Sequence, residues 1–315
     1  MELSKDIILT LKQLQGVGNK TIFKIVQQVK QPLTSIEDLC DFWKNLKGKK
    51  LESISKDDII EAYDNAKKLI ERSAEASIGF ISYYDTMYPD ILRETINEDE
   101  KLDPPLILWY RGDLNVIKMP SVAFIGTREA TNEGVLGGTY LSGEFAKRGF
   151  NIVSGLAIGC DTCGHKGALK AGGKTTAFLA NGLDHNSIYP SENKDLAEDI
   201  VSNGGLLLSE YPIGQSVNKY SLVARDRLQA GLSLATVVIQ TGVNGGTMHA
   251  AKTTLLANKP LFVVKFKDEA TNNHEKCQGN KYLVNRGAKY ISGRDNIDAI
   301  CKQIMKRKEI KSSLF

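Results

Sequence analysis

The sequence of 315 residues has no apolar run near the length of about 18 residues that a membrane-spanning helix needs. Its longest apolar stretches, LATVVIQ and LFVVKF, have the length of single strands. The N-terminus, MELSKDIILTLKQLQG, lacks the basic segment, apolar segment and small-residue cleavage site of a secretory signal. These absences predict a cytoplasmic protein without a membrane partner.

Cysteine is also scarce: the chain has only five. Five cysteines in a chain of this length form no dense disulfide framework, which fits a reducing compartment. Cys160 and Cys163 have the spacing of a redox or zinc motif. A zinc site needs four ligands, however, and the other two candidate ligands, His274 and Cys277, lie far along the chain. We therefore interpret both thiols as small buried residues and predict no metal.

Familiar catalytic motifs are missing as well. There is no G-x-S-x-G elbow, no H-E-x-x-H helix and no paired-carboxylate constellation. GALKAGGKTTAFLA differs from a P-loop because its glycines are one residue too far apart and it joins a helix to a following strand. The sequence therefore predicts no ATP hydrolysis and no recognisable enzyme. Its net charge of +4 permits a polyanionic partner without proving one.

Residues 1–78 predict a small all-helical domain, with helices over 4–15, 19–29, 38–46 and 55–76. Thr34 and Glu37 have the spacing of a capping box. LQGVGNKT has the form of a helix-hairpin-helix turn, whose amides can grip a DNA phosphate, although such glycines also occur in plain helix turns.

Residues 79–315 predict an α/β domain with an extended Rossmann-like, doubly wound parallel sheet. Residues 79–120 form a connecting segment with a short strand, LILWY, and an acidic cluster, NEDEKLD. Continuously apolar strands then alternate with amphipathic helices, which indicates a parallel sheet covered on both faces. The expected strands are 122–125, 151–154, 175–180, 206–209, 236–240 and 261–265; the expected helices are 134–148, 162–171, 192–202, 221–233 and 247–257.

Ligands of such sheets bind at the C-terminal ends of the strands, and three of these ends carry candidate anion-binding residues. At the first, Gly126 allows a turn, Thr127 follows it, and Arg128 offers a forked cation that suits phosphate. The second and third glycines of the G-x-G-x-x-G fingerprint are absent, so we expect no tightly bound dinucleotide and no cofactor.

The second strand end is GLAIGCDTCGHKGAL. Gly159 closes a loop, Asp161 is placed to cap the next helix, and Lys166 is a further candidate phosphate contact. Asp161 and His165 have the spacing to pair across one helical turn. Because no nucleophile accompanies them, we expect these two residues to hold the loop in shape rather than to act as acid and base.

The third group lies further along the chain. Arg225 and Arg227 fall within one turn of an expected helix, and Gly246 and Thr247 open another helix as a ready anion site. Arginines beside an ordinary turn would be surface residues if each motif stood alone. Several anion sites without a catalytic centre suit an extended polyanion better than a single nucleotide.

The order of these motifs resembles the DprA/Smf family of DNA-processing proteins over nearly the whole chain. YYDTMYPDILRETI, DPPLILWYRGDL, VAFIGTR, GLAIGCDTCGHKGAL, NGLDHNSIYPSENKDL, LLLSEYPIG and CQGNKYLVNRGAKYISGRDNI carry the resemblance. It implies a non-enzymatic protein that binds and protects single-stranded DNA, forms a homodimer through its Rossmann-like domain and loads the RecA recombinase during natural transformation. By position it implies DNA contacts at Gly126, Thr127, Arg128, Lys166, Arg225 and Arg227. To these we add the anion site at Gly246 and Thr247, which is expected from its place at a helix N-terminus.

Three departures separate the chain from the family pattern. The family's Phe-Pro-x-Arg-Asn-Arg segment is replaced here, so that Leu222 stands for the aromatic residue and Asp226 brings a negative charge. NGGTMHAAKTT leans towards the related phosphoribohydrolases, but Ala250 stands where those enzymes have a glutamate. The chain also ends without room for the family's winged helix. The alternative is therefore a nucleotide-binding sensor or phosphoribohydrolase-like enzyme, with DNA uptake, repair or defence as possible settings; a scaffold that binds protein partners through the acidic segment is a further rival.

Overall fold

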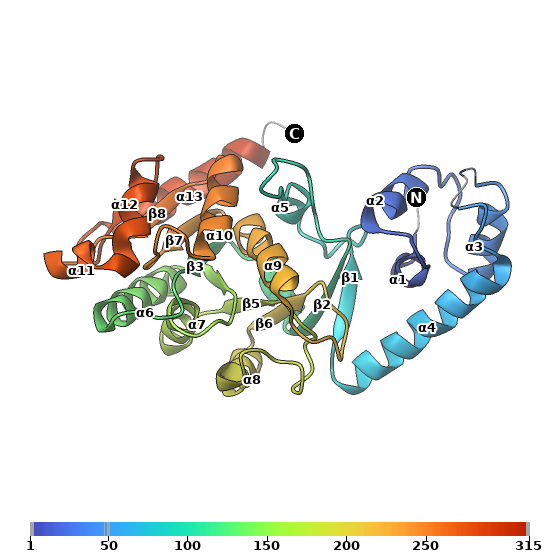
Figure 1. Cartoon of the computed structure of the whole chain (residues 1–315), viewed down its shortest axis with the longest axis horizontal. Coiled ribbons are helices and arrows are strands. Elements are labelled where there is room, and N and C mark those ends of the chain that lie inside the picture. Colours follow the sequence, from blue (N-terminus) through green and yellow to red (C-terminus); the bar gives the residue numbers. More distant parts are fainter. Residues whose placement is uncertain (1–2, 47, 49–50, 313–315) are drawn as a thin grey trace. The chain divides into compact units, whose positions relative to one another are not determined.

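The computed structural model describes residues 3–46, 48 and 51–312, with side chains to residue 306 (Figure 1). The chain divides into two compact units. Unit 1 comprises Met1–Tyr88 and Leu106–Trp109, and unit 2 comprises Pro89–Pro105 and Tyr110–Phe315. Residues 79–88, which we expected to open the second domain, thus lie in the first compact unit.

Among the residues that the structure describes, unit 1 contains four helices, the strand β1 and the first residues of β2 (Ile107–Gly112). The helices are α1 (Lys5–Gln13), α2 (Asn19–Val26), α3 (Ile36–Trp43) and α4 (Lys56–Glu75), and β1 spans Gly79–Ser82. Matching caps begin α3 and α4, because Ser35 pairs with Asp38 and Ser55 with Asp58 in reciprocal capping boxes. The capping box expected at Thr34 and Glu37 is therefore wrong by one residue. Thr34 instead donates its hydroxyl to Asp38.

Unit 2 contains the predicted α/β domain. Its first elements are α5 (Asp90–Arg93), the end of β2 (Ile107–Gly112), η1 (Leu114–Lys118), β3 (Ser121–Ile125), α6 (Asn132–Lys147), β4 (Asn151–Ser154), α7 (Cys160–Lys170) and β5 (Thr175–Leu179). They are followed by η2 (Ser191–Asn193), α8 (Lys194–Ser202), β6 (Leu206–Ser209), α9 (Lys219–Leu232), β7 (Ala235–Val238), α10 (Thr247–Leu256) and β8 (Leu261–Val264). The last elements are α11 (Glu269–Asn273), η3 (Glu275–Cys277), α12 (Gln278–Val284), β9 (Lys289–Ile291) and α13 (Ile297–Ser312).

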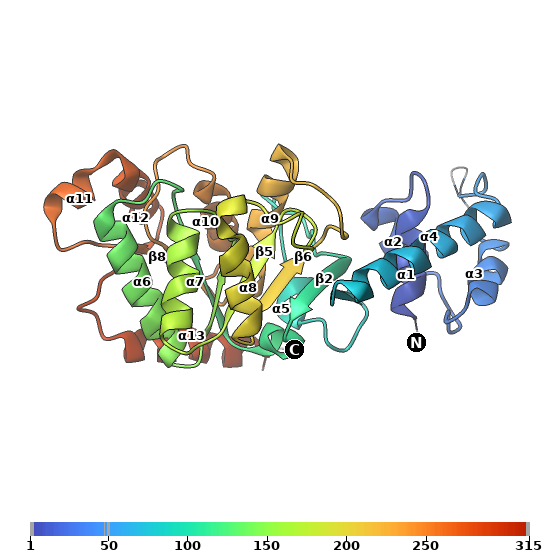
Figure 2. The ribbon, with the colours of Figure 1, turned by 90° about the horizontal axis from the view of Figure 1, so that it is seen from below.

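The sheet of unit 2 is parallel and doubly wound, as predicted. Its strands follow the order β6-β5-β4-β3-β7-β8-β9, and each neighbouring pair is parallel. The five strands from β3 to β7 are buried along their whole length, because helices cover both faces. Figures 1 and 2 show α6, α7 and α8 side by side on one face; α9 and α10 pack on the other.

Close approach of α6 and α7 depends on glycine. A Cβ atom built on Gly167 would lie 1.9 Å from Ser142 Oγ and 2.3 Å from the carbonyl oxygen of Thr139. Any other residue at position 167 would therefore push the two helices apart. In the part of the chain that the structure describes, no helix has both the length and the apolar character to cross a membrane.

Candidate functional site

The topological switch point of the sheet lies between β3 and β7. From β3 the chain proceeds to β4 on one side, while β7 pairs with β3 on the other, with Ile125 opposite Val238. Doubly wound sheets bind ligands at this point, where loops diverge from the C-terminal strand ends. A cavity of about 400 Å³ opens there, and we name it the switch pocket. It is lined by residues 125–129, Ala157, Asp161, Arg225, Asp226, Gln229, Thr241, Gly242, Gly245, Gly246, Thr247 and Ala250.

A second cavity, of about 240 Å³, lies beside the ends of β4 and β5, and we name it the side pocket. Arg128, Ala157 and Arg225 line both cavities, so the two are adjacent. Tyr189 and Leu222 supply apolar wall to the side pocket alone. Sequence reasoning did not identify Tyr189 as a site residue, because it lies between predicted elements in the SIYPSENKDL stretch.

The N-terminus of α10 presents free backbone donors to the switch pocket. Met248 and His249 donate their amides to the carbonyl oxygens of Gly245 and Gly246. The amides of Gly246 and Thr247 have no acceptor among the described residues. Two free N–H groups at the positive end of a ten-residue helix form an anion-binding arrangement. Gly246 and Thr247 thus open α10, as the sequence predicted, and their contact with DNA stays a prediction.

The loop after β3 is built differently from the expected phosphate loop. The backbone N–H of Thr127 donates to the carbonyl oxygen of Gln240 at 2.7 Å, and the carbonyl oxygen of Thr127 accepts from the amide of Cys160 at 3.1 Å. A Cβ on Gly126 would come within 2.5 Å of Cys160 Sγ. Gly126 and Thr127 therefore hold the loop against its neighbours, and the amide of Thr127 has no capacity left for a phosphate.

Arg128 is the uncommitted cation of the site. Its side chain is exposed, and it makes no hydrogen bond or ion pair with any other residue that the structure describes. The backbone of Gly159, with φ of 78°, packs directly against the backbone of Arg128. A Cβ at Gly159 would lie 2.4 Å from the carbonyl oxygen of Arg128. The backbone at Arg128 is thus held in place while its guanidinium is free to meet a ligand.

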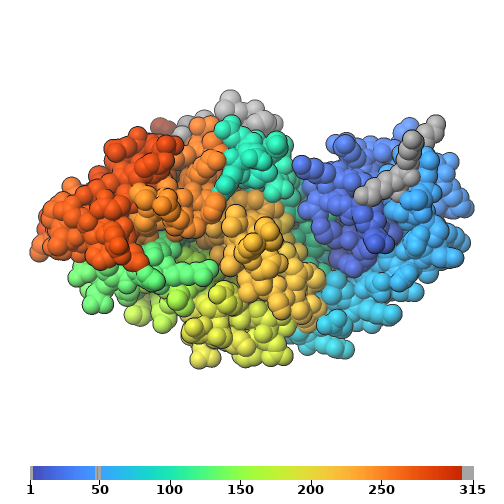
Figure 3. Space-filling view, viewed as in Figure 1, coloured from blue at the N-terminus to red at the C-terminus, as the bar shows by residue number. Residues whose placement is uncertain are grey.

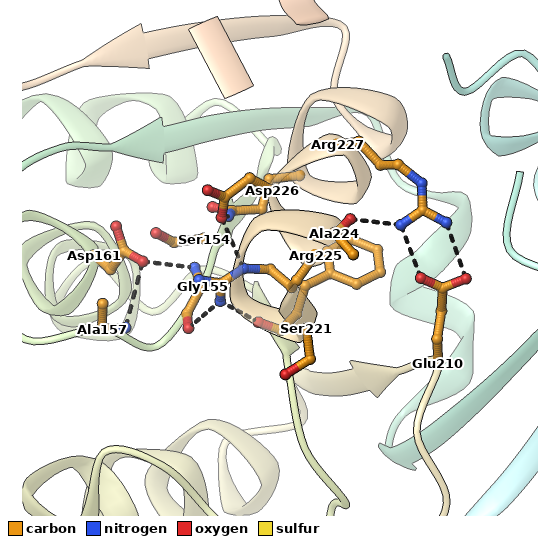
Figure 4. A network of polar contacts seen from close by, with 12 residues as sticks. Ser154, Gly155, Ala157, Asp161, Glu210, Ser221, Ala224, Arg225, Asp226 and Arg227 are labelled. Carbon is orange, nitrogen blue, oxygen red and sulfur yellow. Dashed lines mark hydrogen bonds and ion pairs between the residues drawn. The ribbon is translucent and has the colours of Figure 1, made fainter. Parts of the chain in front are cut away.

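Arg225 reaches the site but is largely committed to the fold. It is 6% exposed and donates to the carbonyl oxygens of Gly155 and Phe178, while its Nε pairs with Asp226 at 3.0 Å. The guanidinium of Arg225 occupies the space that a side chain at position 155 would need, because a Cβ on Gly155 would lie 2.1 Å from Arg225 Nη1. Figure 4 shows Arg225 extending into the loop between β4 and α7. It shapes both pockets more than it supplies free charge.

Arg227 does not line either pocket. Its guanidinium forms a two-pronged ion pair with Glu210, at 2.8 and 3.0 Å, and a further pair with Asp103 at 2.7 Å. Figure 4 shows it leaving α9 in the direction opposite to Arg225. Residues two positions apart lie on opposite sides of a helix, so the spacing of Arg225 and Arg227 in the sequence already indicated that their side chains point in different directions. The structure thus gives Arg227 a stabilising contact within the fold, outside both pockets.

Asp161 and His165 occupy separate places in the fold. The Asp161 carboxylate accepts hydrogen bonds from the backbone amides of Gly155 and Ala157, at 3.0 and 3.3 Å. Burial raises the pKa of Asp161 to about 6, although the positive charge of Arg225 acts in the opposite direction. The N-cap of α7 is Gly159, so the predicted capping role of Asp161 is wrong. His165 bonds Thr175 at 2.6 Å instead of Asp161, and burial lowers its pKa to about 3.

Helix α9 contributes Arg225, Asp226 and Gln229 to the wall of the switch pocket. Leu222, Arg225, Asp226 and Gln229 have the three- and four-residue spacing of one helix face. Asp226, noted from the sequence as a departure, indeed lines the pocket, and burial raises its pKa despite the adjacent charge of Arg225. Gln229 was missed, although its position four residues after Arg225 gave the signal.

Lys166 lies on the second turn of α7, where it is exposed and lines neither pocket. The four expected cations therefore do not converge: Arg128 and Arg225 share a site, and Arg227 and Lys166 lie outside it. Two arginines and three carboxylates, those of Glu129, Asp161 and Asp226, line the switch pocket. The pocket is thus not a simple basic groove.

All five cysteines are buried and unpaired. Cys160 and Cys163 lie in the first turn of α7 and belong to the hydrophobic cluster under α6. Within the described residues, no group of three histidine, cysteine or carboxylate side chains comes together as a metal site would require.

Comparison with known proteins places this chain in a family. The model of the family described as DNA recombination-mediator protein A matches residues 79–304. Protein Smf of Synechocystis is 33% identical over 231 residues, which cover 72% of this chain and 55% of the relative. DNA processing protein DprA of Streptococcus pneumoniae is 34% identical over 219 residues, covering 68% of this chain and 71% of the relative.

Two solved structures agree with this placement. The crystal structure of DprA from Streptococcus pneumoniae has a TM-score of 0.72 at 27% identity, and the match covers 93% of this chain and 96% of that one. DNA processing protein A from Helicobacter pylori, whose structure describes a single-stranded DNA binding mode, has a TM-score of 0.59 at 29% identity and covers 73% of this chain and 96% of its own. The chain therefore belongs to the DNA recombination-mediator protein A family, that of the DprA and Smf proteins.

Proposed function

We propose that this chain binds single-stranded DNA, with a backbone phosphate held in the switch pocket by Arg128 and the amides of Gly246 and Thr247. The observation that carries this proposal is the combination of an exposed, unpaired guanidinium and two free helix N-terminal amides on one cavity. A forked cation and backbone donors are the groups that bind phosphate. Family membership and the single-stranded DNA binding described for the Helicobacter pylori relative support the choice of ligand.

The side pocket extends this site by one base. Leu222 stands at the family's aromatic position, but Tyr189 lines the same cavity with 41% of its surface exposed. Stacking of a base on an exposed aromatic side chain contributes about 1–3 kcal/mol to the binding of a single strand. We place the base next to the bound phosphate against Tyr189, which offers a stacking surface in place of the family's aromatic residue.

Arg225 contributes to this function by shaping the two cavities, and Asp226 limits how much positive charge they carry. An exposed Lys166 remains a candidate contact for DNA beyond the pocket. The bound strand is therefore held by few charges, so its affinity depends strongly on Arg128.

The biological role that we propose is that of a recombination mediator. The description of its family as a DNA recombination mediator supports this role. We further propose that the chain forms a homodimer and that it passes single-stranded DNA to a RecA-type recombinase. Light scattering after size exclusion measures the first claim, and a monomer at micromolar concentration would refute it. The rate of RecA filament growth on coated single strands measures the second, and no acceleration by the chain would refute it.

The DNA proposal is tested with three proteins and one labelled oligodeoxynucleotide. Fluorescence anisotropy compares the wild type, Arg128→Ala and the matched control Arg294→Ala, whose exposed arginine lines neither the switch pocket nor the side pocket. We expect Arg128→Ala to weaken binding at least tenfold and Arg294→Ala to change it less than twofold. Equal affinity of all three proteins, or absence of binding by the wild type, would sink the proposal.

A further inference from the structure

The switch pocket offers two hydrogen-bond acceptors, Asp226 Oδ2 and Gln229 Oε1, that have no partner among the residues that the structure describes. Oδ1 of Asp226 accepts from Arg225 Nε at 3.0 Å and from Gln229 Nε2 at 3.1 Å. Oδ2 of Asp226 has no hydrogen bond to any described residue. One carboxylate oxygen is thus fixed by the protein and the other is left for a ligand.

Gln229 provides the second and more telling acceptor. Its side chain is 2% exposed, it lines the switch pocket, and Oε1 has no partner among the described residues. The orientation of the amide is settled by Asp226, because exchanging its oxygen and nitrogen would set oxygen against carboxylate. Buried acceptors almost always have partners, so an unpaired one on a side chain that lines a cavity points to a ligand that donates a hydrogen bond.

The pocket therefore suits a ligand that carries both an anionic group and hydrogen-bond donors. The phosphate subsite is the one proposed above, formed by Arg128, Gly246 and Thr247. Asp226 and Gln229 stand three residues apart on α9, so that their acceptors are adjacent. Vicinal hydroxyl groups on a phosphorylated sugar match that set, and a carboxylate that accepts from ribose hydroxyls is a known feature of doubly wound nucleotide sites. Deoxyribose lacks the 2′-hydroxyl that would fill the second acceptor.

We propose that the switch pocket binds a ribonucleoside 5′-phosphate, whose ribose hydroxyls donate to Asp226 Oδ2 and Gln229 Oε1. The proposal rests on the proposed function only in placing phosphate at the same subsite. The same chemistry is present in a free ribonucleotide and in an RNA strand, and the test separates the two sources. A ribonucleotide held there competes with single-stranded DNA for the pocket.

Isothermal titration of the full chain with AMP, dAMP and inorganic phosphate tests the ribose contact. We expect AMP to bind at least tenfold more tightly than dAMP, since the lost hydrogen bond to a buried acceptor is of that order. Gln229→Met should abolish this preference, and Gln303→Met, on the exposed face of α13, should keep it. Asp226→Asn serves as a second variant if Gln229→Met unfolds, and it should also narrow the preference.

Anisotropy with labelled oligoadenylate as RNA and as DNA separates the sources. Tighter binding of the RNA strand, lost in Gln229→Met, assigns the site to a strand; AMP binding without a preference for the RNA strand assigns it to a free nucleotide. Equal affinity for AMP and dAMP, together with equal affinity for both strands, overturns the inference. If DNA binds and AMP does not, with no preference for RNA, the inference fails while the proposed function stands. If DNA does not bind and AMP does, the proposed function fails alone.

Discussion

Replacing Arg227 by methionine removes the buried cation that joins three segments of unit 2. The side chain of Arg227 is 9% exposed and that of Glu210 is 15% exposed, and both terminal nitrogens of the guanidinium contact the Glu210 carboxylate. Its Nε reaches Asp103 at 2.7 Å. Desolvation by burial opposes the charge, yet these carboxylates outweigh it and raise the pKa of Arg227. Methionine leaves Glu210 buried without a counter-charge.

Breaking a buried pair from one side costs about 3–5 kcal/mol. A domain of 150–250 residues loses roughly 2–4 °C of melting temperature per kcal/mol, so Arg227→Met should lower the melting temperature of unit 2 by about 6–20 °C. Because apolar replacement of both partners is often neutral, Arg227→Met with Glu210→Leu should recover much of this loss. Scanning calorimetry measures all three proteins, with Arg294→Met as the exposed control.

The same series separates a stabilising arginine from a DNA-binding one. Below its melting temperature, Arg227→Met should bind a labelled oligonucleotide within about twofold of the wild type. An unchanged melting temperature together with a tenfold weaker affinity would refute the reasoning, because it would show that Arg227 is exposed to DNA and not committed to Glu210.

Three further predictions follow from the same site. Gly155→Ala places a Cβ against the guanidinium of Arg225 and should destabilise the fold by about 1–3 kcal/mol, which denaturant unfolding measures. Oligonucleotide affinity should rise as pH falls from 7.5 to 5.5, because Asp161, with its pKa raised to about 6, becomes neutral in the switch pocket; Asp161→Asn should flatten this profile. Asp226→Asn removes a second negative charge from that pocket and should strengthen DNA binding in the same assay, and weaker binding would contradict the electrostatic argument.

The framework of unit 2 could be predicted because its signals are local. Apolar runs of strand length, separated by helices, placed β4 and β6 to the residue and the other predicted strands within one or two residues. The N-terminus of α10 was likewise visible, since Gly246 and Thr247 stand at the start of the helix expected over 247–257. Such patterns need no knowledge of distant contacts.

What could not be predicted depends on pairing between distant residues. The amide of Thr127 is occupied by Gln240, and the charge of Arg227 is occupied by Glu210 and Asp103. A sequence shows that a donor or a cation exists, but not whether a residue elsewhere has already engaged it. Arg128 is distinguished from Arg225 and Arg227 only by lacking such a partner among the described residues.

The central claim is that Arg128 holds a phosphate of single-stranded DNA, and the salt dependence of binding tests it most directly. Each phosphate contact on a single strand contributes about −0.7 to the slope of log affinity against log salt concentration. Measured between about 50 and 200 mM salt, Arg128→Ala should have a slope shallower than that of the wild type by about 0.7, whereas Arg294→Ala should keep the wild-type slope. Parallel lines for wild type and Arg128→Ala would contradict the account.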